Sequence, residues 1–215
     1  KYADILTQSF HPVKHITTGE GGAVLTNDKK IAQKIKILRT HGMIKDQSLL
    51  KRNDGTWYYE MQQLGYNYRI TDFQCALGVS QLKKLDSFVS KRKKIANRYN
   101  SSFLKDFFYG RIPQLKKNIG HAYHLYPYQI NFQKIAINRQ TLFNKMKDLG
   151  ILLQVHYFPI HLQPYYKENY GYKEGDFKIA ENFYKQQISL PMYPTLKTDQ
   201  QDYVLDSLKK IIKDS

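Results

Sequence analysis

One lysine in this sequence stands in a setting that suits covalent chemistry. Lys14 lies in a short turn between two apolar runs, with Ser9 five residues before it and a Gly-Glu-Gly-Gly turn after it. A lysine amine is a nucleophile only when it is neutral, so it must be held still and partly desolvated. A lysine that is merely a solvated surface charge needs no such setting. We therefore take Lys14 as the candidate nucleophile.

The polar neighbours of Lys14 leave several roles open. The Ser9 hydroxyl stands at the end of an expected strand, where it can donate to an anion or bond to its own backbone. His11 and His15 flank the lysine and can be read as general acids or as packed or solvated side chains, so they stay unassigned. The glycines of the following turn serve backbone geometry, because glycine accepts positive φ and close approach.

Residues 9–22 read S-F-H-P-V-K-H-I-T-T-G-E-G-G. This run resembles the cofactor-lysine motif S-F-H-x-x-K-x-I-T-T-x-E-G-G of the sugar aminotransferases of the DegT/DnrJ/EryC1/StrS family. The resemblance implies a pyridoxal-phosphate enzyme in which Lys14 is catalytic: it binds the cofactor covalently and later moves a proton between substrate and cofactor. It also implies that Ser9 binds the cofactor phosphate. Relatives that catalyse dehydration carry histidine in place of this lysine, so Lys14 favours transamination.

A second block, residues 64–78, reads L-G-Y-N-Y-R-I-T-D-F-Q-C-A-L-G. It resembles the family segment G-x-N-x-R-x-x-x-x-x-A-A-L-G, with Cys75 in place of one alanine. The family's asparagine bonds the cofactor phosphate in the neighbouring subunit, which implies this role for Asn67 and a homodimer with shared active sites. Asn67 can also be read as a turn residue. Arg69 is a candidate substrate contact through phosphate or carboxylate, or it pairs with a local acid.

A third block, residues 150–166, resembles the family stretch G-I-x-x-x-x-H-Y-x-P-x-H-x-Q-x-x-Y, which lines the sugar-nucleotide side. Tyr157 and His161 are therefore candidate substrate contacts. His156 and His161 also suggest a metal site, but the close acidic or cysteine partners that such a site needs are missing, so we expect no metal.

Within the family, the spacings in residues 39–43 and 156–160 resemble the transaminase branch of pseudaminic acid synthesis. This branch implies transfer of an amino group, with glutamate as donor, to a UDP-linked 4-keto-6-deoxy-N-acetylhexosamine. The chain starts without Met, inside an expected strand. We therefore expect a preceding part of the enzyme to supply the helix N-terminus for the cofactor phosphate and the aspartate for the pyridinium nitrogen.

The bulk composition bounds the alternatives. The 215 residues carry a formal net charge of +16. This charge suggests a different class of function, a basic non-enzymatic module that binds nucleic acid or another acidic partner. The lysines are scattered through amphipathic segments without a basic recognition helix, so we expect solvated helix faces and no nucleic acid. The single Cys75 fits a reducing compartment, and no segment has the apolar length of a membrane span, so we expect a cytoplasmic protein.

Hydrophobic periodicity and helix signals predict an α/β protein. We expect two short strands around the lysine turn, a helix over 28–41 and a helix from 72 to 82 that opens with the capping box Thr71-x-x-Gln74. The resemblance implies fold type I, the aspartate aminotransferase fold. Residues 1–85 would be the C-terminal part of the cofactor-binding large domain, and 86–215 a linking helix with a small α/β domain.

Further elements are expected in residues 86–215. They are a helix over 86–103, a strand over 121–132, a helix from Asn138 to Leu149, a strand over 151–157, a helix over 176–187, a short extended run over 188–190 and a helix from a second capping box, Thr198-x-x-Gln201, to about Ile212.

Overall fold

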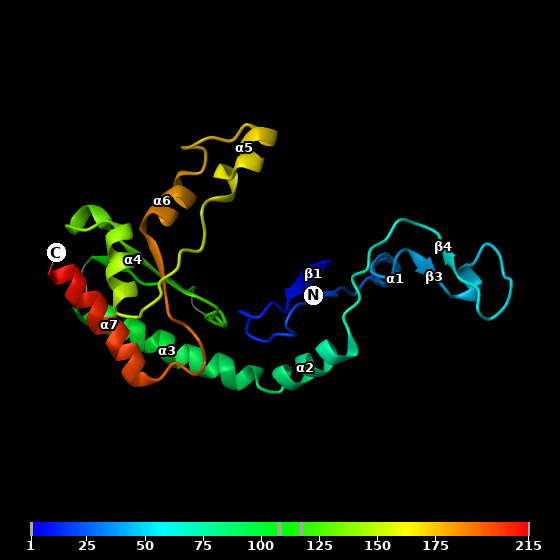
Figure 1. The fold of residues 1–215 in the computed structure, drawn as a ribbon, viewed down its shortest axis with the longest axis horizontal. Helices are drawn as coiled ribbons and strands as arrows, with labels where there is room; N and C mark the ends of the chain where they lie inside the picture. The colour runs from blue at the N-terminus through cyan, green and yellow to red at the C-terminus, as the bar shows by residue number, and fades with distance from the viewer. Residues whose placement is uncertain (1, 107–108, 117, 215) are drawn as a thin grey trace. The chain divides into compact units, whose positions relative to one another are not determined.

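The computed structural model describes residues 2–106, 109–116 and 118–214. The chain divides into two compact units, residues 1–85 and residues 86–215, and each is described by itself. Figure 1 shows their elements along the chain. Both units mix helices and antiparallel strand pairs, as the sequence predicts. In the part of the chain that is described, no helix combines the length and apolar character needed to cross a membrane.

A hairpin brackets the lysine turn in the first unit. Strands β1 (Leu6–Ser9) and β2 (Gly22–Leu25) pair in antiparallel register, with Ser9 opposite Gly22. Helix α1 (Lys29–Leu38) follows, and the Asp28 side chain accepts from two backbone N–H groups of its first turn. The predicted helix extended to residue 41, but the structure ends it at Leu38, because the chain turns through positive φ at the next histidine and glycine.

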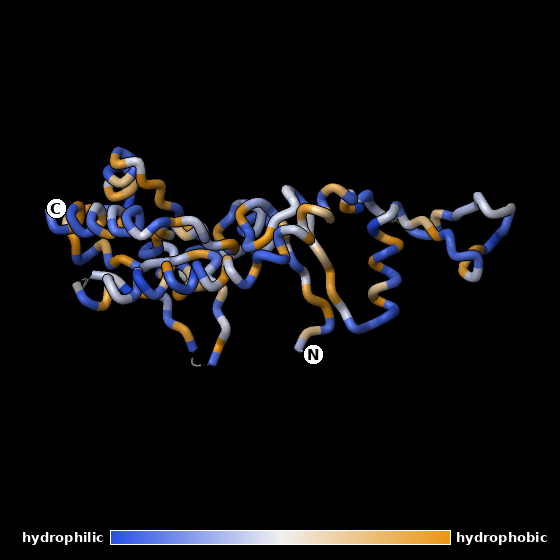
Figure 2. The backbone as a smooth tube through the Cα atoms, turned by 90° about the horizontal axis from the view of Figure 1, so that it is seen from below, coloured by the Kyte–Doolittle hydropathy of each residue, from blue (hydrophilic) through white to orange (hydrophobic). Residues whose placement is uncertain are grey.

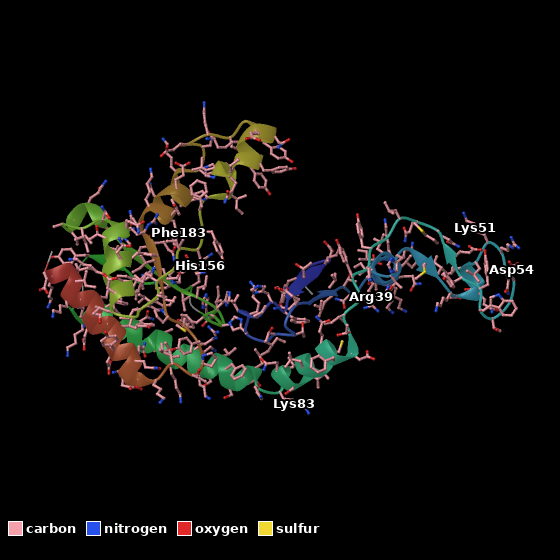
Figure 3. All side chains as sticks on the ribbon, viewed as in Figure 1. Arg39, Lys51, Asp54, Lys83, His156 and Phe183 are labelled. Carbon is pink, nitrogen blue, oxygen red and sulfur yellow. The ribbon has the colours of Figure 1, made fainter. Side chains whose placement is uncertain are left out.

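The rest of the first unit is a loop-rich arm and a helix. Strands β3 (Met43–Ile44) and β4 (Glu60–Met61) pair at the base of the arm, which also contains the 3₁₀ turn Gln47–Leu49. The Glu60 carboxylate accepts from the backbone N–H groups of residues 51 and 52. Lys51 and Asp54, labelled in Figure 3, lie in this loop. Helix α2 (Asp72–Leu82) has the predicted bounds and the predicted capping box.

The second unit has a well-defined core. Helix α3 (Leu85–Asp106) and the sheet β5-β6-β7 enclose aromatic side chains: the rings of Phe103 and Tyr128 stack with centroids 4.0 Å apart, and those of Tyr99 and Tyr126 are tilted with centroids 4.8 Å apart. Figure 2 shows hydrophobic and hydrophilic stretches alternating along the chain. The remaining bounds are β5 (Gly110–Arg111), β6 (Tyr126–Ile130), η2 (Phe132–Lys134), α4 (Arg139–Asp148), η3 (Ile160–Leu162), α5 (Pro164–Tyr170), α6 (Lys178–Gln186), β7 (Gln187–Leu190) and α7 (Thr198–Lys213).

Three sequence predictions in this unit are wrong. The strand expected over 121–132 is confined to Tyr126–Ile130, and the strand expected over 151–157 is reduced to one bridge between Gln154 and Ser189. The second capping box does not form at Thr198: Gln200 accepts from the backbone N–H of Lys197, which is one half of such a box and lies one residue earlier. Gln201 is buried instead and donates to the carbonyl of Ile95, so tertiary packing uses the residue that the local pattern assigned to the cap.

A buried arginine ties three segments of the second unit together. Arg92 of α3 is 5% exposed, and its Nη1 donates to the carbonyls of Tyr123, His124 and Met192 at 3.1, 3.1 and 2.9 Å. Burial lowers the pKa of Arg92 from its ordinary value. The three carbonyl oxygens replace part of the hydration that the guanidinium loses.

Burial differs sharply between the units. Among the described residues of the first unit, Ile44 is the one buried large hydrophobic side chain, and all others of the buried core belong to residues 86–215. Helix α2 is rich in apolar residues and buries none of them: Phe73 is 85% exposed and Leu82 is 57% exposed. A helix that is apolar on most faces is normally covered.

Candidate active site

The lysine turn is closed by backbone hydrogen bonds. The backbone carbonyl of Phe10 accepts from the backbone N–H of Thr18 at 3.0 Å and from the Thr17 hydroxyl at 2.9 Å. The backbone N–H of Phe10 donates to the Gly21 carbonyl. Gly21 has φ of +146°, and a Cβ there would lie 2.5 Å from the Thr18 hydroxyl oxygen. The loop over 10–21 therefore has little freedom, although it contains no regular element.

Lys14 lies at the end of a tight turn in this loop, where its backbone N–H donates to the His11 carbonyl at 2.9 Å. Its side chain is half-buried, and within the described residues its amine makes no hydrogen bond or ion pair. Ser9 is exposed and accepts weakly from the His11 N–H at 3.4 Å, which leaves its hydroxyl hydrogen available. His11 lies 3.9 Å from the exposed Glu20 carboxylate. The loop thus presents an unpaired amine and a hydroxyl donor.

Gln74 connects the second sequence block to this loop. Its Oε1 accepts from the backbone and hydroxyl of Thr71, which completes the capping box, and its Nε2 donates to the carbonyl of Glu20 at 3.0 Å. The Thr18 hydroxyl donates to that same carbonyl. A Cβ on Gly78 would lie 3.0 Å from the Thr18 methyl. Helix α2 therefore packs directly on the lysine loop, a contact that the sequence reasoning missed because the capping pattern explained Gln74 locally.

Asn67 is positioned by two glycines. A Cβ on Gly65 would lie 2.1 Å from the backbone nitrogen of Gly42, so these two backbones meet where no side chain fits. Beyond this contact Asn67 forms a bridge with Thr40, and its side chain is exposed. Arg69 is also exposed and makes no ion pair with a described residue. Both side chains are therefore available to a ligand or to another chain, and among the described residues no hydrogen bond or ion pair joins them to Lys14.

Tyr157 and His161 lie in the second unit and differ in exposure. Tyr157 is 73% exposed. His161 is 8% exposed, and its Nε2 lies 2.9 Å from Oε1 of Glu181. The Glu181 carboxylate also accepts from the backbone N–H groups of Gly175 and Phe177. His161 therefore supports the segment before α6, and its role as a substrate contact stays a prediction.

Two opposing effects act on Glu181. Burial, the larger single influence, favours the neutral acid, but the hydrogen bonds from His161, Gly175 and Phe177 together outweigh it. They lower the pKa of Glu181 from its ordinary value of 4.5. Sequence reasoning missed Glu181, because its only local signal was its place in the first turn of a helix.

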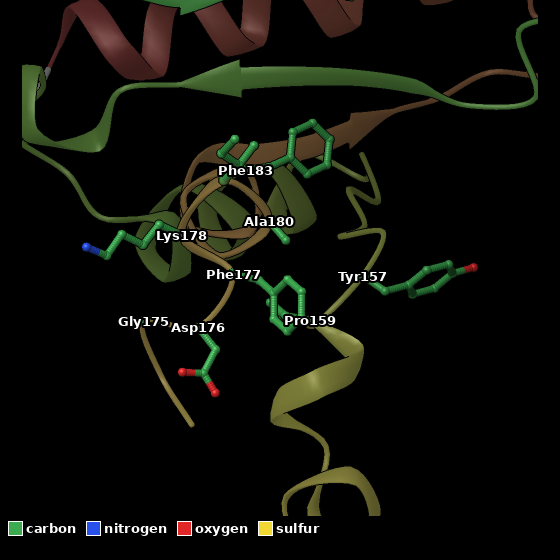
Figure 4. Close-up of a pocket in the computed structure, with 9 residues that line it drawn as sticks. Tyr157, Pro159, Gly175, Asp176, Phe177, Lys178, Ala180 and Phe183 are labelled. Carbon is green, nitrogen blue, oxygen red and sulfur yellow. The ribbon is translucent and has the colours of Figure 1, made fainter. Parts of the chain in front are cut away.

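An open cavity adjoins Tyr157. It has a volume of about 860 Å³. In Figure 4 the phenol of Tyr157 extends away from the side chains of α6. The other lining residues are mainly apolar: Pro159, Gly175, Asp176, Phe177, Lys178, Ile179, Ala180 and Phe183. Such a wall suits the ring faces and methyl groups of a ligand better than a charged group.

The chemistry of the residues present fits pyridoxal phosphate. An unpaired primary amine can bind an aldehyde, and the hydroxyl of Ser9 and the amide of Asn67 can donate to a phosphate. A metal centre has no comparable support: within the described residues no three His, Cys, Asp or Glu side chains gather closely enough to hold an ion.

The sequence of the chain is similar to those of known aminotransferases. Residues 1–209 match the model of the DegT/DnrJ/EryC1/StrS aminotransferase family. The chain is 39% identical over 212 residues to the spore coat polysaccharide biosynthesis protein SpsC of Bacillus subtilis, covering 98% of this chain and 54% of SpsC. It is 40% identical over 213 residues to a UDP-4-amino-4,6-dideoxy-N-acetyl-beta-L-altrosamine transaminase of Campylobacter jejuni, covering 99% of this chain and 54% of that protein.

The fold agrees with this likeness. Helicobacter pylori PseC, an aminotransferase involved in the biosynthesis of pseudoaminic acid, superposes with a TM-score of 0.87 at 34% identity, covering 100% of this chain and 54% of PseC. The chain spans about half the length of the curated relatives it matches.

Proposed function

The chain belongs to the DegT/DnrJ/EryC1/StrS aminotransferase family, whose members use pyridoxal phosphate and have fold type I, and we propose that it is part of a nucleotide-sugar aminotransferase. The observation that carries the proposal is the half-buried, unpaired amine of Lys14 in a loop closed by backbone hydrogen bonds. Residues 1–85 then form the C-terminal part of the cofactor-binding large domain. Residues 86–215 form the linking helix and the small domain.

In this proposal the residues divide the work. Pyridoxal phosphate, when bound, supplies an electron sink for the transfer of the amino group. Lys14 would hold the cofactor covalently through Nζ, and its amine, when free, would move a proton to and from the reacting carbon atoms. Ser9 donates its hydroxyl hydrogen to the cofactor phosphate. Gln74 keeps the loop in register with α2 by bonding the Glu20 carbonyl.

A second copy of the chain completes the proposed site. Asn67 donates to the cofactor phosphate of the partner subunit. The exposed apolar side chains of α2 supply surface that such a homodimer would cover, since the helix buries none of its residues within one chain. Arg69 and Tyr157 are the proposed substrate contacts, and His161 either contacts the substrate or supports the segment before α6.

The proposed substrate is a UDP-linked 4-keto-6-deoxy-N-acetylhexosamine, with glutamate as amino donor, in pseudaminic acid synthesis in the cytoplasm. The Campylobacter jejuni relative and Helicobacter pylori PseC support this choice by their names. SpsC supports a broader choice of sugar substrate, because its name concerns spore coat polysaccharide. Purified UDP-keto-sugars that carry the keto group at carbon 4 or at a different ring carbon, assayed with glutamate, distinguish the two.

A labelling experiment tests the reaction class. The full-length protein is mixed with pyridoxal phosphate, reduced with borohydride and mapped by peptide mass spectrometry. A single label on Lys14 is expected, and Lys14→Arg is the matched control that should take up none at this position. No label, or label spread evenly over many of the surface lysines, refutes the assignment.

The formal charge of +16 favours a second candidate, a basic module that binds an acidic macromolecule. Such a module would bind nucleic acid with an affinity that falls steeply as salt rises. It would also leave Lys14 unlabelled, so the same protein preparation separates the two candidates.

A further inference from the structure

Three side chains of the second unit form a closed ring of hydrogen bonds that the proposed reaction does not use. The backbone N–H of His156 donates to Oε1 of Gln187 at 2.9 Å. Nε2 of Gln187 donates to the Ser189 hydroxyl at 2.6 Å, and this hydroxyl lies 2.7 Å from Nδ1 of His156. The ring joins β7 to the segment that carries Tyr157, and His156 is labelled in Figure 3.

The direction of each bond in the ring follows from one fixed donor. Because the backbone nitrogen of His156 can only donate, the facing atom of Gln187 must be its oxygen, and its amide nitrogen must face Ser189. The Ser189 oxygen therefore accepts from Gln187. Ser189 is 4% exposed, and the structure gives its hydroxyl hydrogen one acceptor among the described residues, Nδ1 of His156.

The tautomer of His156 follows from this. If Nδ1 carried a hydrogen, that hydrogen and the Ser189 hydroxyl hydrogen would compete, and a buried donor would be left without a partner. The satisfied arrangement has a bare Nδ1 and places the proton on Nε2. Burial also lowers the pKa of His156 from its ordinary value of 6.5, which favours the neutral imidazole.

The opposite side of the imidazole is available. His156 is partly exposed, and within the described residues Nε2 has no protein partner and is not fully buried. The Tyr157 ring stands edge-on to it, with centroids 4.6 Å apart at 77°. The backbone of this segment is fixed by the pair of bonds between Gln154 and Ser189, at 2.7 and 3.3 Å.

We propose that Gln187 and Ser189 are positioning residues that hold His156 in the tautomer protonated on Nε2, so that this nitrogen gives a single N–H donor to a neutral oxygen acceptor of the substrate. The class of acceptor, a carbonyl or hydroxyl of the sugar, rests on the proposed function. A neutral donor suits it because a phosphate would attract a second proton to the imidazole. In this arrangement the hydrogen bonds of the protein, and not solvent, set the direction of the Nε2–H donor.

Nuclear magnetic resonance of the full-length protein, labelled with ¹⁵N-histidine, tests the tautomer directly. The His156 signals are identified by their loss in His156→Asn. We expect a neutral ring with a protonated Nε2 at pH 7.5. In Ser189→Ala the ring should populate both tautomers, and Ser189→Thr, which keeps the hydroxyl, should restore the single one. Ser207→Ala, which removes another buried hydroxyl of this unit, is the matched control and should change nothing.

Two results overturn the proposal: a proton on Nδ1 in the unchanged protein, or a single Nε2 tautomer that persists in Ser189→Ala. Kinetics give a second readout. Ser189→Ala should raise KM about tenfold with a much smaller change in kcat, since the lost bond orients a binding group. An equal loss in Ser207→Ala would also overturn it.

The tautomer measurement needs neither cofactor nor substrate, so it is separate from the proposed function. An Nε2 proton together with an unlabelled Lys14 would remove the aminotransferase and leave the positioning role intact. A labelled Lys14 together with a mixed tautomer would remove the positioning role alone.

Discussion

The two units of the chain differ in what they contain: residues 1–85 carry the candidate catalytic lysine, and residues 86–215 carry the buried hydrophobic core. The first unit carries the lysine loop, held by backbone bonds and by Gln74, yet it buries a single large hydrophobic side chain among its described residues. The second unit buries a continuous core of aromatic and aliphatic side chains. The difference shows that backbone hydrogen bonds and one glutamine can hold the lysine loop in a unit that buries little apolar surface.

The largest effect is expected at the centre of the chemistry-bearing unit. Lys14→Ala should lower the transamination rate of the full-length enzyme by at least about 10⁴-fold, because both the covalent link and the proton carrier are lost. The free energy of unfolding of this variant should change little, since the half-buried amine makes no hydrogen bond or ion pair within the described residues. Lys34→Ala, on the exposed face of α1, is the control. Activity near that of the unchanged enzyme in Lys14→Ala would contradict the assigned role.

The core of the second unit should dominate stability. Leu208 is fully buried, and Leu208→Ala should lower the free energy of unfolding by about 2–5 kcal/mol, through lost burial and the cavity left behind. Urea unfolding of the full-length protein measures it. Leu82→Ala, at a position 57% exposed within one chain, removes the same atoms and should cost under about 1 kcal/mol per chain. Equal costs would erase the contrast between the units.

A charged substitution on α2 tests whether a second copy of the chain covers this helix. Phe73 is 85% exposed on α2, and Phe73→Asp should raise the dissociation constant of the homodimer at least tenfold, or about 1.4 kcal/mol. Sedimentation over a range of concentrations measures it. Leu104→Asp, at a 73% exposed position of α3, is the matched control. The same dimer in both variants would show that α2 is covered by something other than a second copy.

A smaller effect is expected at a helix end in the first unit. The Asp28 carboxylate accepts from the N–H groups of Lys30 and Ile31 at 2.7 and 3.2 Å. Asp28→Ala should cost about 1 kcal/mol, and it should appear as faster amide hydrogen exchange confined to α1. Asp28→Asn keeps the acceptor and should retain most of the protection. Exchange that rises equally in the second unit would mean that the units unfold together.

The weakest effect at neutral pH concerns Glu181. Its pKa is lowered in the folded protein, so its contribution is present above the ordinary value of 4.5 and is lost as the pH falls through the lower, folded value. Glu181→Gln should therefore flatten the decline of the free energy of unfolding in the acid range. Denaturant curves at a series of pH values from 3 to 7 measure this slope, and an unchanged slope would contradict it.

Local signals predicted the first unit better than the second. The capping box at Thr71 predicted the start of α2, whose predicted end at Leu82 also agrees with the structure, and Asp28 began α1 where the pattern placed it. These signals are short-range, so they survive without a core. The residues of the lysine loop were found because their order along the chain is unusual. Their exposure, and the bond from Gln74 to the Glu20 carbonyl, could not be read from spacing.

Long-range packing explains what was missed. The sequence predicts a strand over residues 151–157, but Gln154 makes one bridge to Ser189 and the following segment bonds through the side chains of Gln187 and Ser189 instead. Helix α5 escaped prediction because its tyrosines pack on one another and not on a core, so its pattern lacks an apolar stripe. Residues 151–157 are therefore decided by partners far along the sequence, whereas the contacts of α5 are among neighbouring tyrosines.

Arg92 has a consequence for the order of folding. Its guanidinium meets carbonyls that follow it by 31, 32 and 100 residues, so the charge is compensated only after two loops of very different length have closed. A chain that has collapsed around α3 without the segment at Met192 would bury a cation with an incomplete shell of acceptors. Such intermediates are penalised relative to the finished unit, and this single side chain therefore makes the folding of residues 86–215 more nearly all-or-none.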